Sequence, residues 1–209
     1  MLRRCIPMIS CSVTSINRRH FVTDIALANA KQMNGSQQDK AQQKREQSYV
    51  PSGSDGQFYI KQLNDHWRSA VAGQSFKKEN VIGFVSGNLY SMPTRFTVQL
   101  TRNKHMHFTG GLEFINHSCN PNTRIEVVET EAKVSFVAIT SIKKGEHLTF
   151  DYSTSEWDMD EKFDCRCGAL KCRGHIGGAK YLSDDEVKTR LPYFTPSILQ
   201  QLLDRKLTN

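Results

Sequence analysis

Short hydrophobic runs, each ended by a turn signal, dominate the middle of the chain. Residues 81–85 (VIGFV) form an apolar run of β-branched and aromatic side chains that stops at Ser-Gly-Asn. In residues 95–100 (RFTVQL) apolar and polar side chains alternate, and after the turn signal TRNK the strand signal continues in HMHF. Alternation on both sides of a short turn is typical of a β-hairpin. We therefore expect a strand followed by a hairpin.

A second pair of strands follows. Residues 123–128 (TRIEVV) and 133–139 (KVSFVAI) flank the polar segment ETEA. Residues 141–152 (SIKKGEHLTFDY) then add a turn at Lys144-Gly145 and another short strand. No helical period separates these runs, so the pattern predicts a mainly β domain.

Helical signals are confined to the C-terminal end. Ser183 and Glu186 have the spacing of a capping box, and Thr195-Pro196 has the residues of an N-cap followed by a first-turn proline. In the segment SILQQLLDRKL the spacing puts three side chains on one face: Ile198, Leu202 and Leu203. We expect this helix to pack on the domain, with partner binding as the alternative.

The first 57 residues differ in composition from the rest. Residues 1–30 carry four arginines, several Ser and Thr, and one acidic residue, Asp24. This pattern fits an organellar transit peptide or a disordered basic tail, and it lacks the apolar region of a secretory signal. Residues 31–57 are rich in Gln, Ser, Gly and charge, so we expect a disordered linker and a domain that begins near Phe58.

The charge of the chain is concentrated near this N-terminal part. The chain has 28 Lys and Arg against 21 Asp and Glu; the first 57 residues hold eight and four of them, which leaves 20 and 17. A nearly balanced domain does not predict a nucleic-acid surface. No apolar stretch approaches the roughly 18–20 residues that span a bilayer, so we expect no membrane segment.

Four of the six cysteines lie in the second half of the chain. Cys165, Cys167 and Cys172 have the spacing C-x-C-x4-C in CRCGALKCRG, and Cys119 is the one other cysteine of the domain. Neighbouring thiols on an extended backbone diverge and make poor disulfides, whereas clustered thiols without a secretory signal are typical of zinc sites. Reduced structural cysteines are the alternative. Four thiolates leave no open position, so such a zinc is expected to be structural.

Three motifs in order carry a resemblance to a known family. They are NHSCNPN (residues 116–122), GEHLTFDY (residues 145–152) and the cysteine segment CRCGALKCRG. Together they resemble a SET-domain protein-lysine methyltransferase with a post-SET zinc segment. The resemblance implies a fold of short strands with a pseudoknot, S-adenosylmethionine as methyl donor and a protein lysine as acceptor.

Site residues follow from the same motifs. By resemblance, Asn116 and His117 face the adenine end of the cofactor, and Phe163 covers the adenine. Tyr152 places its hydroxyl where the methyl group passes from sulfur to nitrogen. The family's glycine-containing cofactor loop has no G-x-G counterpart in NDHWRSAVAG, so Trp67 is the candidate for that contact by stacking.

One further departure concerns the acceptor side. After VIG the family commonly has a tyrosine that lines the lysine channel, and this chain has Phe84. These departures keep two alternatives open: a catalytically degenerate SET domain that acts as a zinc-stabilised protein-binding module, and a small zinc-binding structural domain unrelated to methylation. His105 and His107 alternate along one strand and form a further, weaker metal-ligand pair.

The expected organisation is therefore a tail or transit peptide (1–30), a linker (31–57), a SET domain (58–157), a post-SET zinc segment (158–178) and a C-terminal helical extension (179–209). We expect a monomer that acts on a protein substrate without direct nucleic-acid contact. Its location is mitochondrial or otherwise organellar if the transit peptide is real, and nuclear or cytoplasmic if it is not.

Overall fold

A computed structural model describes residues 48–207. The predictions for residues 1–30 and for 31–47 of the linker lie outside the described residues. The strands of the described part are short, as the turn signals predicted. Their bounds are β1 (Ser48–Tyr49), β2 (Phe58–Asn64), β3 (Trp67–Ala72), β4 (Val81–Ser86), β5 (Asn88–Tyr90), β6 (Thr97–Thr101), β7 (Lys104–His107), β8 (Asn116–His117), β9 (Thr123–Val128), β10 (Lys133–Ala138), β11 (Thr149–Phe150), β12 (Phe163–Asp164) and β13 (His175–Ile176).

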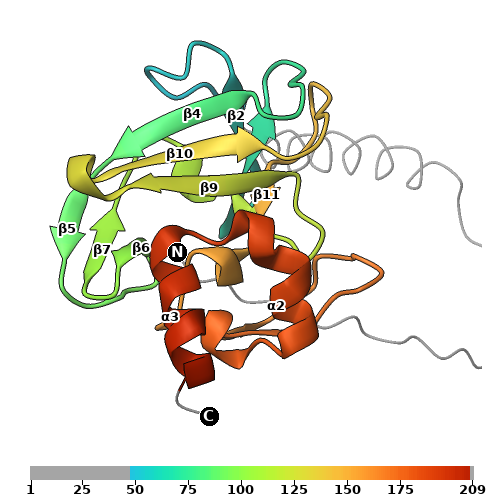
Figure 1. The fold of residues 1–209 in the computed structure, drawn as a ribbon. Coiled ribbons are helices and arrows are strands. Elements are labelled where there is room, and N and C mark those ends of the chain that lie inside the picture. Colours follow the sequence, from blue (N-terminus) through green and yellow to red (C-terminus); the bar gives the residue numbers. More distant parts are fainter. Residues whose placement is uncertain (1–47, 208–209) are drawn as a thin grey trace, which may run out of the picture.

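These strands form three three-stranded sheets and two small pairs. The sheets have the orders β1-β2-β3, β4-β10-β9 and β5-β7-β6, and the pairs are β12-β13 and β11-β8. Figure 1 shows the β4-β10-β9 sheet at one end of the molecule and the C-terminal helices at the other. The β11-β8 pair is parallel, whereas the other strand pairs are antiparallel. The prediction of a mainly β fold is confirmed.

The predicted hairpins form as the hydrophobic pattern indicated. β6 and β7 pair in register from Thr97↔His107 to Thr101↔Lys104, and β9 and β10 pair over six consecutive positions. Val98, Leu100 and Met106 point into the core and are buried. Burial of alternate apolar residues therefore fixes the register, because a slip by one residue would turn them outward.

The folded part begins earlier than the sequence suggested. β1 pairs antiparallel with β2, and both Pro51 and Ser54 are buried. Pro51 and Phe58 pack so closely on Gly111 that a Cβ there would lie 2.6 Å from the proline ring, and its φ of 105° also favours glycine. A polar composition predicted a linker here because backbone pairing and one buried proline leave little trace in composition.

Helices occur at the C-terminal end of the described chain. They are α2 (Asp184–Arg190) and α3 (Pro196–Leu207), and five single-turn 3₁₀ helices lie elsewhere: η1 (Leu112–Phe114), η2 (Glu129–Glu131), η3 (Tyr152–Thr154), η4 (Ala179–Tyr181) and η5 (Leu191–Tyr193). The capping box is confirmed, because Ser183 Oγ accepts from the backbone of Glu186 and the Glu186 side chain accepts from that of Ser183. Within the described residues, no helix combines the length and apolar character needed to cross a bilayer.

The face predicted for α3 is partly wrong. Ile198 and Leu202 are buried with Val187 in a small second core, but Leu203 is 51% exposed. Leu203 follows Leu202 directly and therefore points about 100° away from it around the helix. Thr195 precedes the helix as expected, yet its hydroxyl oxygen has no hydrogen-bond partner and only its carbonyl accepts from the helix.

Candidate functional site

Two of the polar motifs meet at the parallel pair of β8 and β11. Asn116 pairs with Thr149 and His117 with Phe150, so the segment FINH lies directly beside the segment that ends in Tyr152. Ile115 is fully enclosed at 1% exposure and anchors β8 in the core. Residues more than 30 positions apart are thereby fixed side by side.

Tyr152 is held from both ends. Its side chain is 5% exposed, and its hydroxyl donates to the carbonyl oxygen of Ile115 over 3.1 Å. Its backbone N–H donates to Nδ1 of His117 over 3.2 Å. The rings of His117 and Phe163 stand edge-on to it, with centroids 5.3 and 6.1 Å away. The Tyr152 hydroxyl therefore has a defined position, as an orienting group needs.

A cavity of about 120 Å³ opens next to this tyrosine. The structure brings together all five residues that the sequence predicted to bind the cofactor, because each of them lines this cavity. The rest of its lining comes from the cysteine segment that follows Phe163. The complete lining is Trp67, Asn116, His117, Tyr152, Phe163, Asp164, Cys165, Arg166 and Cys167.

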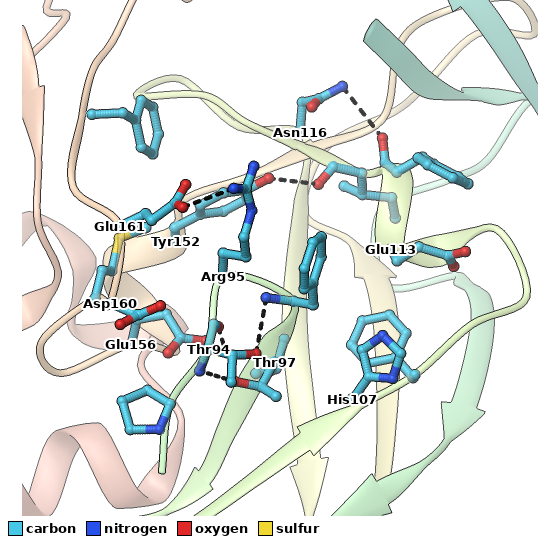
Figure 2. Close-up of a pocket in the computed structure, with 18 of the residues that line it drawn as sticks. Thr94, Arg95, Thr97, His107, Glu113, Asn116, Tyr152, Glu156, Asp160 and Glu161 are labelled. Atoms are coloured by element: carbon cyan, nitrogen blue, oxygen red, sulfur yellow. Dashed lines mark hydrogen bonds and ion pairs between the residues drawn. The ribbon is translucent and has the colours of Figure 1, made fainter. Parts of the chain in front are cut away.

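A larger cavity of about 320 Å³ adjoins the first. Four residues line both cavities: Trp67, Asn116, Tyr152 and Phe163. Figure 2 shows Glu156, Asp160 and Glu161 on one side of the larger cavity and His107 and Glu113 on the other. The shared lining means that Tyr152 lies where the two spaces meet.

An ion pair links two walls of the larger cavity. Arg95, which precedes β6, donates to Glu161 over 2.8 Å, and its guanidinium also lies 5.1 Å from the centroid of the Phe96 ring (Figure 2). Glu161 comes from the segment between η3 and β12. Sequence reasoning missed this pair because its partners are 66 residues apart and neither belongs to a motif.

The amide of Asn116 is used to shape the cavity wall. Its Nδ2 donates to the backbone oxygen of Arg68 over 2.9 Å and to that of Phe114 over 3.3 Å. The guanidinium of Arg68 in turn lies over the Phe114 ring, 5.4 Å from its centroid. Asn116 therefore ties β8 to the start of β3, which carries Trp67.

Phe84 is not brought to either cavity. It lies on β4 with 64% of its surface exposed, and the ammonium of Lys133 sits 4.2 Å from its ring centroid. It lines neither of the cavities described above. Its role in the lysine channel stays a prediction, to which these contacts lend nothing.

The four cysteines of the second half converge as predicted. Their sulfur atoms all lie within 4.8 Å of one another, and those of Cys119 and Cys165 are 3.9 Å apart. Tetrahedral zinc with bonds near 2.3 Å places its sulfurs about 3.8 Å apart. The donor set and its geometry therefore fit a structural zinc ion.

The local electrostatics of the cluster are uneven. Burial raises the pKa of the Cys119 and Cys165 thiols. Burial also acts on Cys167, but the backbone N–H groups of Cys119 and Ala169 outweigh it and lower its pKa to about 6. Thiolate ligands bind metal as anions, so Cys167 is the most readily ionised of these three ligands.

The histidine pair does not form a metal site. His105 is buried with an Nδ1 that has no hydrogen-bond partner, and burial lowers its pKa. His107 instead packs edge-on against the rings of Tyr90 and Phe96. Within residues 48–207, the potential metal ligands that converge are the four cysteines.

Comparisons with known proteins agree with this geometry. Residues 11–153 match the SET domain family. The chain is 46% identical over 66 residues to Histone-lysine N-methyltransferase ASHH3 of Arabidopsis thaliana and 31% identical over 122 residues to Histone-lysine N-methyltransferase set-2 of Caenorhabditis elegans, which is 31% and 57% of this chain. It is also 31% identical over 116 residues, or 55% of its length, to Methyltransferase flvH of Aspergillus flavus. The chain belongs to the SET domain family.

These relatives differ in how far the matching region extends. It covers 18% of the plant protein, 8% of the nematode protein and 62% of the fungal one. Among solved structures, the complex of KRYPTONITE with mCHH DNA, an H3(1-15) peptide and SAH matches 53% of this chain and 27% of that chain, with a TM-score of 0.45 and 20% identity.

Proposed function

We propose that this chain is a protein-lysine N-methyltransferase that uses S-adenosylmethionine. One observation carries the proposal: all five predicted cofactor residues line a single small cavity, and Tyr152 lies where that cavity meets the larger one. The small cavity is assigned to the adenine end of the donor. The larger one receives the acceptor lysine, so donor and acceptor meet beside Tyr152.

The reaction requires alignment rather than a strong nucleophile. The lysine nitrogen attacks the methyl carbon in line, the carbon–sulfur bond breaks, and sulfur keeps the bonding pair, which leaves S-adenosylhomocysteine. Holding two reactants in such a geometry can contribute about 7–11 kcal/mol. The chain supplies this alignment through Tyr152, whose hydroxyl is held by Ile115, and through Asn116, which fixes the wall that carries Trp67.

The acceptor lysine must arrive neutral. Its reference pKa is about 10.4, so at neutral pH an exposed lysine is nearly all ammonium. The apolar and aromatic groups around Tyr152, among them Phe150 and Phe163, disfavour the charged form and thus favour loss of the proton. The Tyr152 phenol, with a reference pKa near 10, can accept or donate a hydrogen bond without ionising.

The zinc site supports this arrangement indirectly. Cys165 and Cys167 line the small cavity, and Phe163 precedes them by two and four positions. When bound, a structural zinc supplies cross-linking and takes no part in the reaction. The four cysteines would hold the segment that forms one wall of the cofactor cavity.

Acceptor and assembly are proposed at the level the chemistry supports. The named relatives act on histone lysines, so histones are the first acceptors to test. We propose a monomer that contacts a protein and not nucleic acid, because residues 58–209 carry nearly balanced charge, with 20 basic and 17 acidic residues.

A non-catalytic binding module is the second candidate. It is favoured by one feature, the turn His66-Trp67-Arg68, where the family's G-x-G loop has no counterpart. Such a module would keep the zinc site and lose the donor. Binding of S-adenosylmethionine separates the two candidates.

Transfer of a labelled methyl group tests the proposal. The zinc-loaded chain is incubated with tritiated S-adenosylmethionine and core histones, and in parallel with a protein extract. We expect label on lysine in the wild type and almost none in Tyr152→Phe. A folded wild type that binds no donor and labels neither acceptor nor itself would favour the binding module.

A further inference from the structure

The carboxylate of Asp151 lies where three parts of the protein meet. Its residue is 4% exposed, and Oδ1 accepts from Nη2 of Arg173 over 2.7 Å and from the backbone N–H of Ser153 over 3.0 Å. Oδ2 accepts from Nε of Arg190 over 2.7 Å. A buried carboxylate with two guanidinium partners on opposite oxygens is fixed in orientation.

Arg190 comes from outside the SET core. It is the last residue of α2, 39 positions after Asp151, and its side chain is 13% exposed. Its Nη1 donates to the carbonyl oxygen of Glu186 over 2.9 Å, which fixes the guanidinium to its own helix. Figure 1 shows α2 among the C-terminal elements, at the end of the molecule opposite the β4-β10-β9 sheet. The helix thus reaches the core through this one buried ion pair.

The same carboxylate borders the proposed reaction centre. Asp151 directly precedes Tyr152, and Oδ1 lies 3.7 Å from Nδ1 of His117. That nitrogen accepts the backbone N–H of Tyr152, so carboxylate, imidazole and tyrosine backbone form one connected group. A shift of Asp151 would be passed to the two residues that line both reacting sides of the small cavity.

We propose that Arg190 is a positioning residue for methyl transfer, acting through Asp151 on Tyr152 and His117; this inference rests on the proposed function. The C-terminal helical extension is then part of the catalytic unit. Arg173 holds Oδ1 and also belongs to the zinc segment, where its N–H lies 3.4 Å from Cys119 Sγ. Arg190 alone among these contacts holds the carboxylate from the side of α2.

Loss of Arg190 has a definite consequence in this geometry. Oδ2 loses a charged donor in a buried setting, and the carboxylate is then free to turn toward Arg173. Tyr152 starts from the next backbone nitrogen, so its hydroxyl moves relative to the donor and acceptor. A displacement near 1 Å can slow an aligned reaction about 100-fold.

The test compares three variants of the zinc-loaded full chain. Arg190→Ala removes the contact, and Arg190→Lys keeps the charge without the planar fork. Arg205→Ala is the matched control, because Arg205 donates to the carbonyls of Lys180 and Leu182 and so ties down the same extension. Zinc content is verified, and the affinity for S-adenosylmethionine and the rate of tritium transfer to core histones are measured well below each variant's Tm.

We expect Arg190→Ala to retain zinc and to lose about 10- to 100-fold in transfer rate. Arg190→Lys recovers part of the loss, and Arg205→Ala stays within about twofold of the wild type despite a lower Tm. Equal rates for Arg190→Ala and Arg205→Ala, once both are folded, overturn the proposal. If Arg190→Ala does not fold, Arg190→Lys decides: a wild-type rate overturns it. A wild type that binds no donor refutes the proposed function instead.

Discussion

Tyr152 has the most constrained side chain of the candidate site. Its hydroxyl, backbone and ring are each held by a different partner: Ile115, His117 and Phe150. A tyrosine at the end of an apolar strand usually points its hydroxyl to the surface. Here the hydroxyl donates to a carbonyl beside the core, which makes its position a property of the fold.

Substituting Tyr152 by phenylalanine should separate chemistry from folding. The change removes one buried donor to Ile115 and costs about 1–3 kcal/mol of stability, as an unsatisfied carbonyl does. Methyl transfer should fall by about 100-fold or more because the orienting hydroxyl is gone. Donor binding, measured by titration, should change only a few-fold. Tyr59→Phe is the control, and an active Tyr152→Phe enzyme would contradict the assigned role.

Asp158 gives a residue-scale prediction about pH. Burial raises its pKa, but hydrogen bonds from Lys180, Lys162 and Tyr181 outweigh this and lower it to about 2. A depressed folded-state pKa adds stability above the unfolded value near 4, and that stability is lost as the pH falls toward 2. The side chain is 36% exposed, so we expect less than about 1 kcal/mol.

Urea denaturation at several pH values checks this. The difference in unfolding free energy between the wild type and Asp158→Asn should be positive at pH 6 and shrink below about pH 4. A difference that stays constant down to pH 2 would show that the cluster does not act through the charge of Asp158.

Residues within motifs could be predicted from the sequence, and residues that act across the fold could not. Cys119 and Cys167 were found because thiol chemistry limits what clustered cysteines can do. Arg190 and Arg95 were missed, since an arginine on the surface of a helix or loop has no local signal that it will meet a buried acid. The exposure of Phe84 was missed for the same reason.

At the scale of elements, the cysteine segment depends on metal. β12 and β13 are two residues each, and between them lie few buried apolar side chains. Such a segment cannot order itself by burial alone. Zinc binding in small structural sites provides about 10–16 kcal/mol, which is enough to offset that lack.

Removing one zinc ligand should therefore disorder this segment. Cys167→Ser is expected to lose the metal, to lower the Tm, and to abolish donor binding because Cys165 and Cys167 line the cofactor cavity. Metal analysis and thermal unfolding measure the effect, with Cys11→Ser as a control that keeps the described cluster intact. Full donor affinity in zinc-free Cys167→Ser would contradict the assigned role of the segment.

The capping box of α2 makes a smaller prediction. Ser183→Ala removes the side-chain oxygen that accepts from the backbone of Glu186, and it should cost about 1 kcal/mol. Denaturant unfolding measures this, and Ser52→Ala, at an exposed turn, should cost almost nothing. Equal stability of the two variants would mean that the box adds nothing to the helix.

Elements were predicted better than their partners. The strands at residues 81–85 and 133–138 could be recognised because burial imposes a visible alternation. The parallel pairing of β8 with β11 could not, because two-residue strands carry no pattern of their own. Their pairing depends on the core that closes around Ile115 and Phe150.

At the scale of the whole molecule, two cores are joined through the site. The main core fills the β-rich part, and a smaller one lies under α3 around Val187, Ile198 and Leu202. Asp151 and Arg190 connect them beside Tyr152. A sequence pattern predicts each core separately but not that the catalytic residues lie at their junction.

Titration of the zinc-loaded chain with S-adenosylmethionine tests the central claim most directly. The account predicts saturable binding at one site, weakened at least about 10-fold by His117→Ala and little changed by Phe84→Ala, because His117 lines the small cavity and Phe84 does not. Folded, zinc-loaded protein that binds no S-adenosylmethionine would contradict it.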